Sequence, residues 1–226
     1  MFPYPCISQF QFLDFSLSQL HRLYPRLLWR LQAGARFLDI GCCLGHDIRK
    51  LIFDGVPAAQ LKGVELQQGF IDLGFELFRD KDRLPPDTFL QGDILEDGAP
   101  WTELAGTGTG GFDVVQLANL LHLLAYEEQI TAFKRAIQCL KPGLGTTIFG
   151  IAAGTVGGTV EDWAGKKVPA HNVDSFKKLV ADLEKRTETK WTVEVSLDFA
   201  MYKYGNRRPW GSELVRRVVF ELTRVG

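Results

Sequence analysis

The stretch RFLDIGCCLGHDIRKL, from Arg36 to Leu51, constrains the fold of this chain more than any other. Its apolar, β-compatible residues at 37, 38 and 40 are typical of a strand covered on both faces. Gly41 and Gly45 follow, and glycine permits backbone angles and close approaches that a Cβ would block. Asp47 then falls in the first turn of a helix, where the helix dipole favours a carboxylate. We therefore expect a strand, a glycine turn and a helix, which together bind nucleotide-like ligands at the carboxyl edge of a parallel sheet.

The glycine pattern of this turn excludes two common kinds of ligand. A dinucleotide-binding turn needs glycine at its first, third and sixth positions, but the chain has Gly41, Cys43 and His46 there. A phosphate-binding loop ends in Gly-Lys-Ser/Thr, whereas the second glycine here is followed by histidine and an aspartate that would repel a pyrophosphate. The remaining features are Asp39 with the two glycines, and Glu65 at the end of the next predicted strand. The carboxylate of Glu65 can accept both ribose hydroxyls of an adenosine. An acidic adenosine site without a phosphate cradle suits a cationic sulfonium cofactor.

Further motifs follow this turn along the chain, in segments 61–66, 90–94, 112–116 and 140–143. On this ordered set the chain resembles class I methyltransferases that use S-adenosyl-L-methionine, although Cys43 replaces the middle glycine of their usual first motif. The resemblance implies that Asp93 accepts from the adenine amino group and that Ile94 packs on the adenine ring. The cofactor-binding residues that it implies are Asp39, Gly41, Gly45, Glu65, Leu66, Asp93, Ile94 and Gln116.

Four segments narrow the resemblance to fungal methyltransferases that act on small molecules: 2–7, 39–45, 78–80 and 120–123. Such enzymes work in polyketide and meroterpenoid pathways, and several of them methylate a carboxylate. The resemblance therefore implies an O-methyltransferase of secondary metabolism that acts on a small apolar acid. Relatives of this kind usually carry an additional N-terminal stretch, so we expect the cofactor cleft to be less covered here.

The periodicity along the chain predicts a Rossmann-like, seven-stranded, mostly parallel sheet with helices on both faces and a C-terminal antiparallel hairpin. Pro25 is expected to split a helical segment at 16–31 into two short helices. The glycine- and threonine-rich stretch 152–170 is expected to be a mobile loop beside the cleft, and 107–111 a surface linker. Predicted strands are 37–40, 60–65, 88–91, 112–117 and 146–151, predicted helices 47–53, 70–78, 127–140 and 174–185, and the hairpin joins 191–204 to 213–223.

The composition limits the partners and the compartment. The 226 residues suit a single methyltransferase domain, with 1–32 forming an arm and helices over the cofactor cleft and 33–226 the catalytic core. The 26 basic and 27 acidic residues form no basic stripe, which disfavours nucleic acid, and the arginines at 22, 26 and 30 are interpreted as a solvated face. The four cysteines have no metal-binding spacing, so no metal is expected. No membrane-spanning run or signal peptide is found, so the chain is expected in the cytoplasm. Its expected partner is a small-molecule substrate, and the sequence does not decide whether it forms a homodimer.

The best candidate for a catalytic side chain is His122, just beyond the fourth predicted strand. A carboxylic acid is ionised at neutral pH, with a pKa of about 4, so it needs a group that holds it rather than a strong base. His46 is interpreted as cofactor-site packing, His171 as a weaker substrate-facing candidate and His21 as structural. Side chains weighed for the substrate pocket against ordinary structural roles are Tyr4, Trp163, Lys203, Arg207, Arg208 and Trp210.

Two other functions stay open on the sequence. The same cofactor supports C- or N-methylation, or a cyclisation that transfers no methyl group. A non-catalytic partner subunit with a degenerate cofactor site is the alternative from another class, supported by Cys43 and the short N-terminus.

Overall fold

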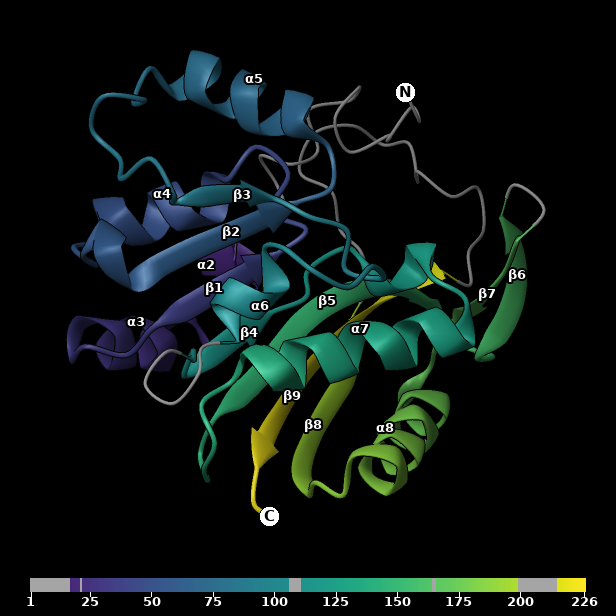
Figure 1. Ribbon diagram of the computed structural model, residues 1–226. Helices are drawn as coiled ribbons and strands as arrows, with labels where there is room; N and C mark the ends of the chain where they lie inside the picture. The colour runs from purple at the N-terminus through teal and green to yellow at the C-terminus, as the bar shows by residue number, and fades with distance from the viewer. Residues whose placement is uncertain (1–16, 21, 106–110, 164–165, 199–214) are drawn as a thin grey trace.

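The computed structural model describes residues 17–20, 22–105, 111–163, 166–198 and 215–226. Within these ranges the chain forms a seven-stranded sheet with helices on both faces (Figure 1). Tyr4, His21, most of the linker at 107–111, and the candidates Lys203, Arg207, Arg208 and Trp210 lie outside the described residues. None of the helices in the described ranges is long and apolar enough to cross a membrane.

The sheet has the strand order β3-β2-β1-β4-β5-β9-β8. The first five strands run parallel, while β9 is antiparallel to both of its neighbours. This arrangement confirms the Rossmann-like fold and the C-terminal antiparallel hairpin predicted from the sequence. The strands are β1 (Phe37–Ile40), β2 (Leu61–Glu65), β3 (Phe89–Gln91), β4 (Val114–Gln116), β5 (Thr147–Thr155), β8 (Trp191–Asp198) and β9 (Val215–Arg224).

Two hydrophobic clusters hold the helices against the sheet. Helices α3 (Tyr24–Gln32), α4 (His46–Phe53) and α5 (Gln68–Phe78) bury apolar side chains against one face, which carries Phe37 and Phe149. Helices α6 (Trp101–Leu104), α7 (Tyr126–Cys139) and α8 (Val173–Thr187) cover the other face, where Phe133, Phe176 and Phe220 stack edge to face or tilted. Because both faces are covered, β1 and β4 are buried along their whole length. Three short elements complete the description: α2 (Leu17–Leu20), η2 (Ala58–Gln60) and η3 (Leu121–Leu123).

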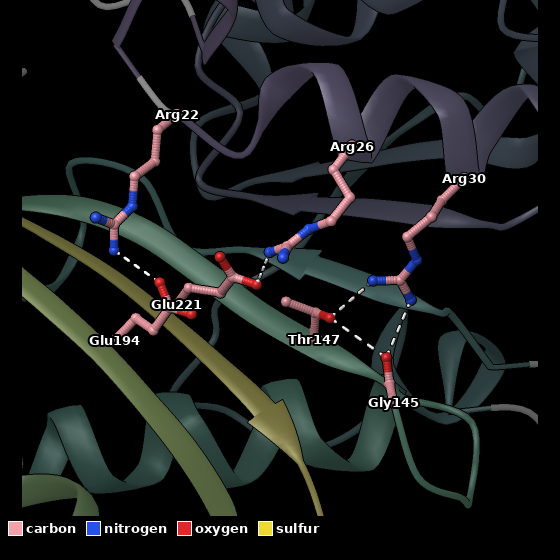
Figure 2. Close-up of polar contacts among 7 residues, drawn as sticks. All are labelled: Arg22, Arg26, Arg30, Gly145, Thr147, Glu194 and Glu221. Carbon is pink, nitrogen blue, oxygen red and sulfur yellow. Dashed lines mark hydrogen bonds and ion pairs between the residues drawn. The ribbon is translucent and has the colours of Figure 1, made fainter.

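Polar contacts join the first helices to the last strands of the sheet. Arg22 pairs with Glu194 of β8 at 2.8 Å, Arg26 pairs with Glu221 of β9, and Arg30 donates to the Thr147 hydroxyl at 2.9 Å (Figure 2). The interpretation of these arginines as a solvated face is therefore incomplete. The side chains of Arg22 and Arg26 stay 62% and 57% exposed, yet the charged ends reach the sheet.

The prediction of a mobile loop at 152–170 is wrong. Strand β5 continues to Thr155, and the chain then forms an antiparallel hairpin of β6 (Thr159–Trp163) and β7 (Lys166–Ala170). Thr155 joins the start of this hairpin to its end, because its hydroxyl accepts the Thr159 N–H at 3.2 Å and contacts the Ala170 carbonyl at 3.3 Å. Threonine and valine favour strands, so these segments form a hairpin although their glycine content indicated a loop.

Candidate active site

A cavity of about 350 Å³ opens at the carboxyl ends of β1, β2, β3 and β4. The strand order reverses between β1 and β4, and ligands of open α/β sheets bind where this reversal occurs. The lining residues are 39–43, 46–47, 64–66, 70, 92–95, 116, 118–120, 123–124 and 166.

The turn between β1 and α4 forms one wall of the cavity. The N–H groups of Gly41 and Cys42 both donate to the Val64 carbonyl, at 2.8 and 3.1 Å, which fixes the turn to the end of β2. Gly41, Cys43 and Gly45 all have positive φ angles, so the chain reverses sharply within five residues. Gly45 does not line the cavity, and a Cβ on it would lie 2.4 Å from the Phe89 ring. This glycine therefore shapes the turn behind the wall.

Glu65 lines the cavity at the end of β2 and is buried. One carboxylate oxygen accepts the Cys43 N–H at 2.9 Å, and the other accepts the Gln67 N–H at 3.0 Å. Burial raises the pKa of Glu65, while the backbone N–H groups act in the opposite direction. Each oxygen keeps a second lone pair, so the side chain can also accept two hydroxyl groups from a ligand.

Three buried polar side chains from β1, α4 and β4 meet beside this turn. Asp39 and Gln116 are register neighbours on adjacent strands, and the Gln116 amide donates to Asp47 at 3.0 Å. Asp47 also accepts the Leu17 N–H at 2.8 Å. Burial raises the pKa of Asp39 well above its usual value, and the charge of Asp47 adds to the effect. The Gln116 side-chain oxygen is buried and has no hydrogen-bond partner among the described residues.

The loop after β3 forms the other end of the cavity. One Asp93 oxygen accepts the Leu95 N–H at 2.9 Å, and the Asp93 carbonyl accepts from the Trp101 indole at 2.7 Å. Ile94 is buried, while Leu66 across the loop is 45% exposed. The fold thus brings all of the predicted cofactor-binding residues except Gly45 to one cavity.

His122 lies on η3 and is not among the residues that line the cavity, although its neighbours Leu120 and Leu123 are. Its Nδ1 accepts the Ala153 N–H at 3.4 Å, and burial lowers its pKa to about 4. The ring is therefore neutral at pH 7, and because Nδ1 is the acceptor, the proton belongs on Nε2. Its catalytic role stays a prediction.

The other two histidines of the described chain have different surroundings. His46 lines the cavity, with Nε2 at 3.8 Å from a carboxylate oxygen of Asp47, and its interpretation as cofactor-site packing stays a prediction. His171 is buried away from the cavity lining and bonds to Gln129 at 2.8 Å and Ser175 at 3.1 Å. Burial lowers the pKa of His171 to about 4. These contacts give His171 a structural role.

Sequence reasoning missed one charged lining residue, Lys166 on β7. The segment was predicted to be a loop, so no strand pairing was available from which the direction of the Lys166 side chain could be inferred. The predicted position of that segment beside the cleft is nevertheless confirmed. None of the described residues of α2 and α3 lines the cavity. The nearest link is indirect, because the Leu17 N–H donates to the lining residue Asp47.

Comparison with known proteins identifies the family. A profile for a methyltransferase domain matches residues 37–143. O-methyltransferase phiE from Fungal sp. (strain ATCC 74256) is 37% identical over 99% of this chain and 78% of its own length. O-methyltransferase atr3 from Stereocaulon alpinum is 35% identical over the whole chain, which spans only 64% of that relative. The chain belongs to the class I S-adenosylmethionine-dependent methyltransferase family, together with these fungal enzymes.

The fold comparison agrees with this assignment. The structure of a Haemonchus contortus phosphoethanolamine N-methyltransferase, solved with S-adenosylhomocysteine, superposes with a TM-score of 0.63 at 15% identity. The match covers 89% of this chain and 52% of that protein. At this identity the likeness concerns the fold alone.

Proposed function

We propose that the cavity binds S-adenosyl-L-methionine and that the protein is an O-methyltransferase of fungal secondary metabolism. The observation that supports this most directly is the unpartnered, buried oxygen of Gln116 beside Asp39 and Asp47. The side-chain oxygens at this end of the cavity can accept hydrogen bonds from an ammonium group. The methionine part of S-adenosyl-L-methionine carries an ammonium group. The acidic lining also suits the positive charge of the sulfonium.

The remaining lining residues fit the rest of the cofactor. Glu65 would accept the ribose hydroxyls, Asp93 would accept the adenine amino group, and Leu66 and Ile94 would pack on the ring. The left-handed turn at Gly41 would allow close approach of the backbone. When bound, the sulfonium supplies an electrophilic methyl group.

For the methyl acceptor we propose a carboxylate on a small apolar metabolite. The relatives phiE and atr3 are named as O-methyltransferases, which supports transfer to oxygen. His122 is next in sequence to the lining residue Leu123 and is neutral at pH 7, with a pKa of about 4, so it would help to position the acceptor rather than act as a strong base. A carboxylate needs only such positioning, which contributes roughly 7–11 kcal/mol to reactions of this kind. The cytoplasmic location remains part of this proposal.

Binding of S-adenosylhomocysteine, measured by calorimetry, tests the cofactor assignment. We expect Glu65→Ala to weaken binding at least about tenfold, because the charged bonds to both ribose hydroxyls are lost. Glu76→Ala, which removes an exposed carboxylate on α5, should leave the affinity unchanged. An unchanged affinity of the Glu65 variant would exclude its role, and no binding to the wild-type protein would favour a non-catalytic partner subunit.

Methyl-labelled cofactor tests the type of reaction. Incubation with a panel of carboxylic acids should produce labelled methyl esters, which mild alkali cleaves to labelled methanol. Label that resists alkali would indicate transfer to carbon, nitrogen or a phenol. Turnover of a substrate without any label transfer would indicate a cyclase.

A further inference from the structure

Within the described chain, Lys166 is the one lysine or arginine that lines the cavity, whereas four carboxylates line it from Asp39, Asp47, Glu65 and Asp93. We propose that the ammonium group of Lys166 binds the carboxylate of the methyl acceptor. This inference rests on the proposed function and adds to it the residue that selects an acid.

The topology separates Lys166 from the acidic groups. Glu65 ends β2 and Asp93 follows β3, at one side of the switch point between β1 and β4. Lys166 lies on β7, which packs against η3 and β5 on the other side. The cavity therefore has an acidic part that suits a cation and, on the strand that packs against η3 with its apolar lining residue Leu123, a basic position that suits an anion.

The ammonium group of Lys166 is held in place rather than free to swing. It pairs with Glu128 on the first turn of α7. The same oxygen of Glu128 also accepts the Ala125 N–H at 2.7 Å, which fixes the carboxylate to the start of the helix. A lysine ammonium has three donors, so the ion pair with Glu128 leaves donors for a substrate. The Lys166 side chain is 40% exposed, which keeps this end accessible.

An anionic acceptor needs such a partner because the rest of the cavity repels it. A bound cofactor brings a net charge of +1, whereas Asp47, Glu65 and Asp93 line the cavity beside Asp39, whose raised pKa favours its neutral form. Charge-assisted hydrogen bonds are about twice as strong as neutral ones, so a lysine beside an apolar wall favours an acid over its neutral amide. The same lysine gives no advantage to a neutral phenol or ketone.

Binding of matched acids and amides to the protein saturated with S-adenosylhomocysteine tests this inference, since no chemistry can then occur. The probes are salicylic acid, 2,4-dihydroxy-6-methylbenzoic acid and abietic acid, each compared with its own amide by calorimetry. We expect the wild-type protein to prefer at least one acid over its amide by about tenfold or more. Lys166→Met should abolish the preference, and Lys166→Arg should retain most of it.

Lys167→Met is the matched control, because this neighbour on β7 is exposed and does not line the cavity. It should keep the preference for the acid, and all three variants should bind S-adenosylhomocysteine with wild-type affinity. A lysine that only attached the hairpin to α7 would change thermal stability but not the ratio of acid to amide affinity. A preference that survives in Lys166→Met, or a wild-type protein that binds the cofactor product but prefers no acid, overturns the inference while the cofactor assignment stands. If the wild-type protein does not bind S-adenosylhomocysteine, the proposed function itself fails.

Discussion

Glu65 serves the fold and the candidate site with the same two oxygens. Its bonds to the N–H groups of Cys43 and Gln67 hold the glycine turn and the start of α5 at the end of β2. The turn is therefore shaped by a charge that a ligand would also use. This arrangement makes the conformation of Cys43 important for the site, since its N–H is one of the two donors.

Cys43 has a φ angle of 51°, a left-handed conformation that costs roughly 1–2 kcal/mol for a residue with a Cβ. Cys43→Gly should relieve this strain, so we expect the free energy of unfolding to stay within about 1 kcal/mol of wild type and cofactor affinity to be retained. Cys43→Val should lower the free energy of unfolding by about 1–2 kcal/mol and weaken cofactor binding, because a β-branched residue tolerates this φ least. Urea denaturation and calorimetry measure both effects. Equal stability of the two variants would show that the turn carries no such strain.

At the scale of elements, Arg49 connects its own helix, α4, to α5 and to the glycine turn between β1 and α4. Its guanidinium donates to Asp80 at 2.6 and 3.0 Å and to the Leu44 carbonyl at 2.6 Å, and it lies over the rings of Phe75, Phe78 and Phe89. The segment 78–80, which contributed to the resemblance, thus begins at the last residue of α5 and supplies, through Asp80, the anion for a mostly buried arginine. Through Leu44 this cluster supports the turn from behind.

Two glycines of α5 test how closely this helix must pack. A Cβ on Gly74 would lie 2.6 Å from the Leu44 carbonyl, whereas one on Gly69 would meet nothing within 4 Å. We expect Gly74→Ala to destabilise the protein by about 1–3 kcal/mol and to weaken cofactor binding, because the helix must move away from the turn. Gly69→Ala should be neutral or stabilising by up to about 1 kcal/mol, since alanine is the better helix former. A stable Gly74→Ala variant with wild-type cofactor affinity would refute the close packing.

The elements that the sequence predicted share strong local signals. Glycine turns, apolar strands and helical spacing recur along 37–151, so the sequence could predict the parallel sheet and seven residues that line the cavity at its edge. The hairpin of β6 and β7 could not, because glycines at 157, 158 and 165 interrupt this segment and indicate a loop, whereas pairing between the two strands decides the structure. Lys166 was missed for the same reason. Gly45 was assigned to the ligand because a sequence motif does not separate a glycine in the wall from one behind it.

At the scale of the whole molecule, Arg26 and Glu221 connect the first helices to the last strand, as Figure 2 shows. The Glu221 side chain is only 6% exposed, so loss of its partner would leave a buried charge unpaired. We expect Arg26→Met to lower the free energy of unfolding by about 1–3 kcal/mol. Arg22→Met removes a similar pair in which both side chains are more than half exposed, and it should cost less than about 1 kcal/mol. Equal effects in urea denaturation would contradict this dependence on burial.

His171 couples the packing of α7 and α8 to pH. The ring bonds to Gln129 of α7 and Ser175 of α8 and lies edge to face against Phe176. Burial lowers its pKa to about 4, while a histidine in the unfolded chain has a pKa of about 6.5. As the pH falls through this window the unfolded chain takes up the proton first, so stability present above about pH 6.5 is lost towards pH 4.

The contribution of His171 can be isolated from that of other groups by subtraction. His122 shifts in the same direction, whereas the carboxyl groups of Asp39 and Glu65, whose pKa values are raised, act in the opposite direction. All three are present in both wild type and His171→Gln, so they cancel in the difference in unfolding free energy between the two proteins. We expect this difference to favour wild type most above about pH 7 and to shrink by about 2–3 kcal/mol as the pH falls to 4, because glutamine takes up no proton. Urea denaturation at half-unit pH intervals measures it, and a difference that stays constant with pH would mean that His171 has the same pKa in the folded and unfolded chain.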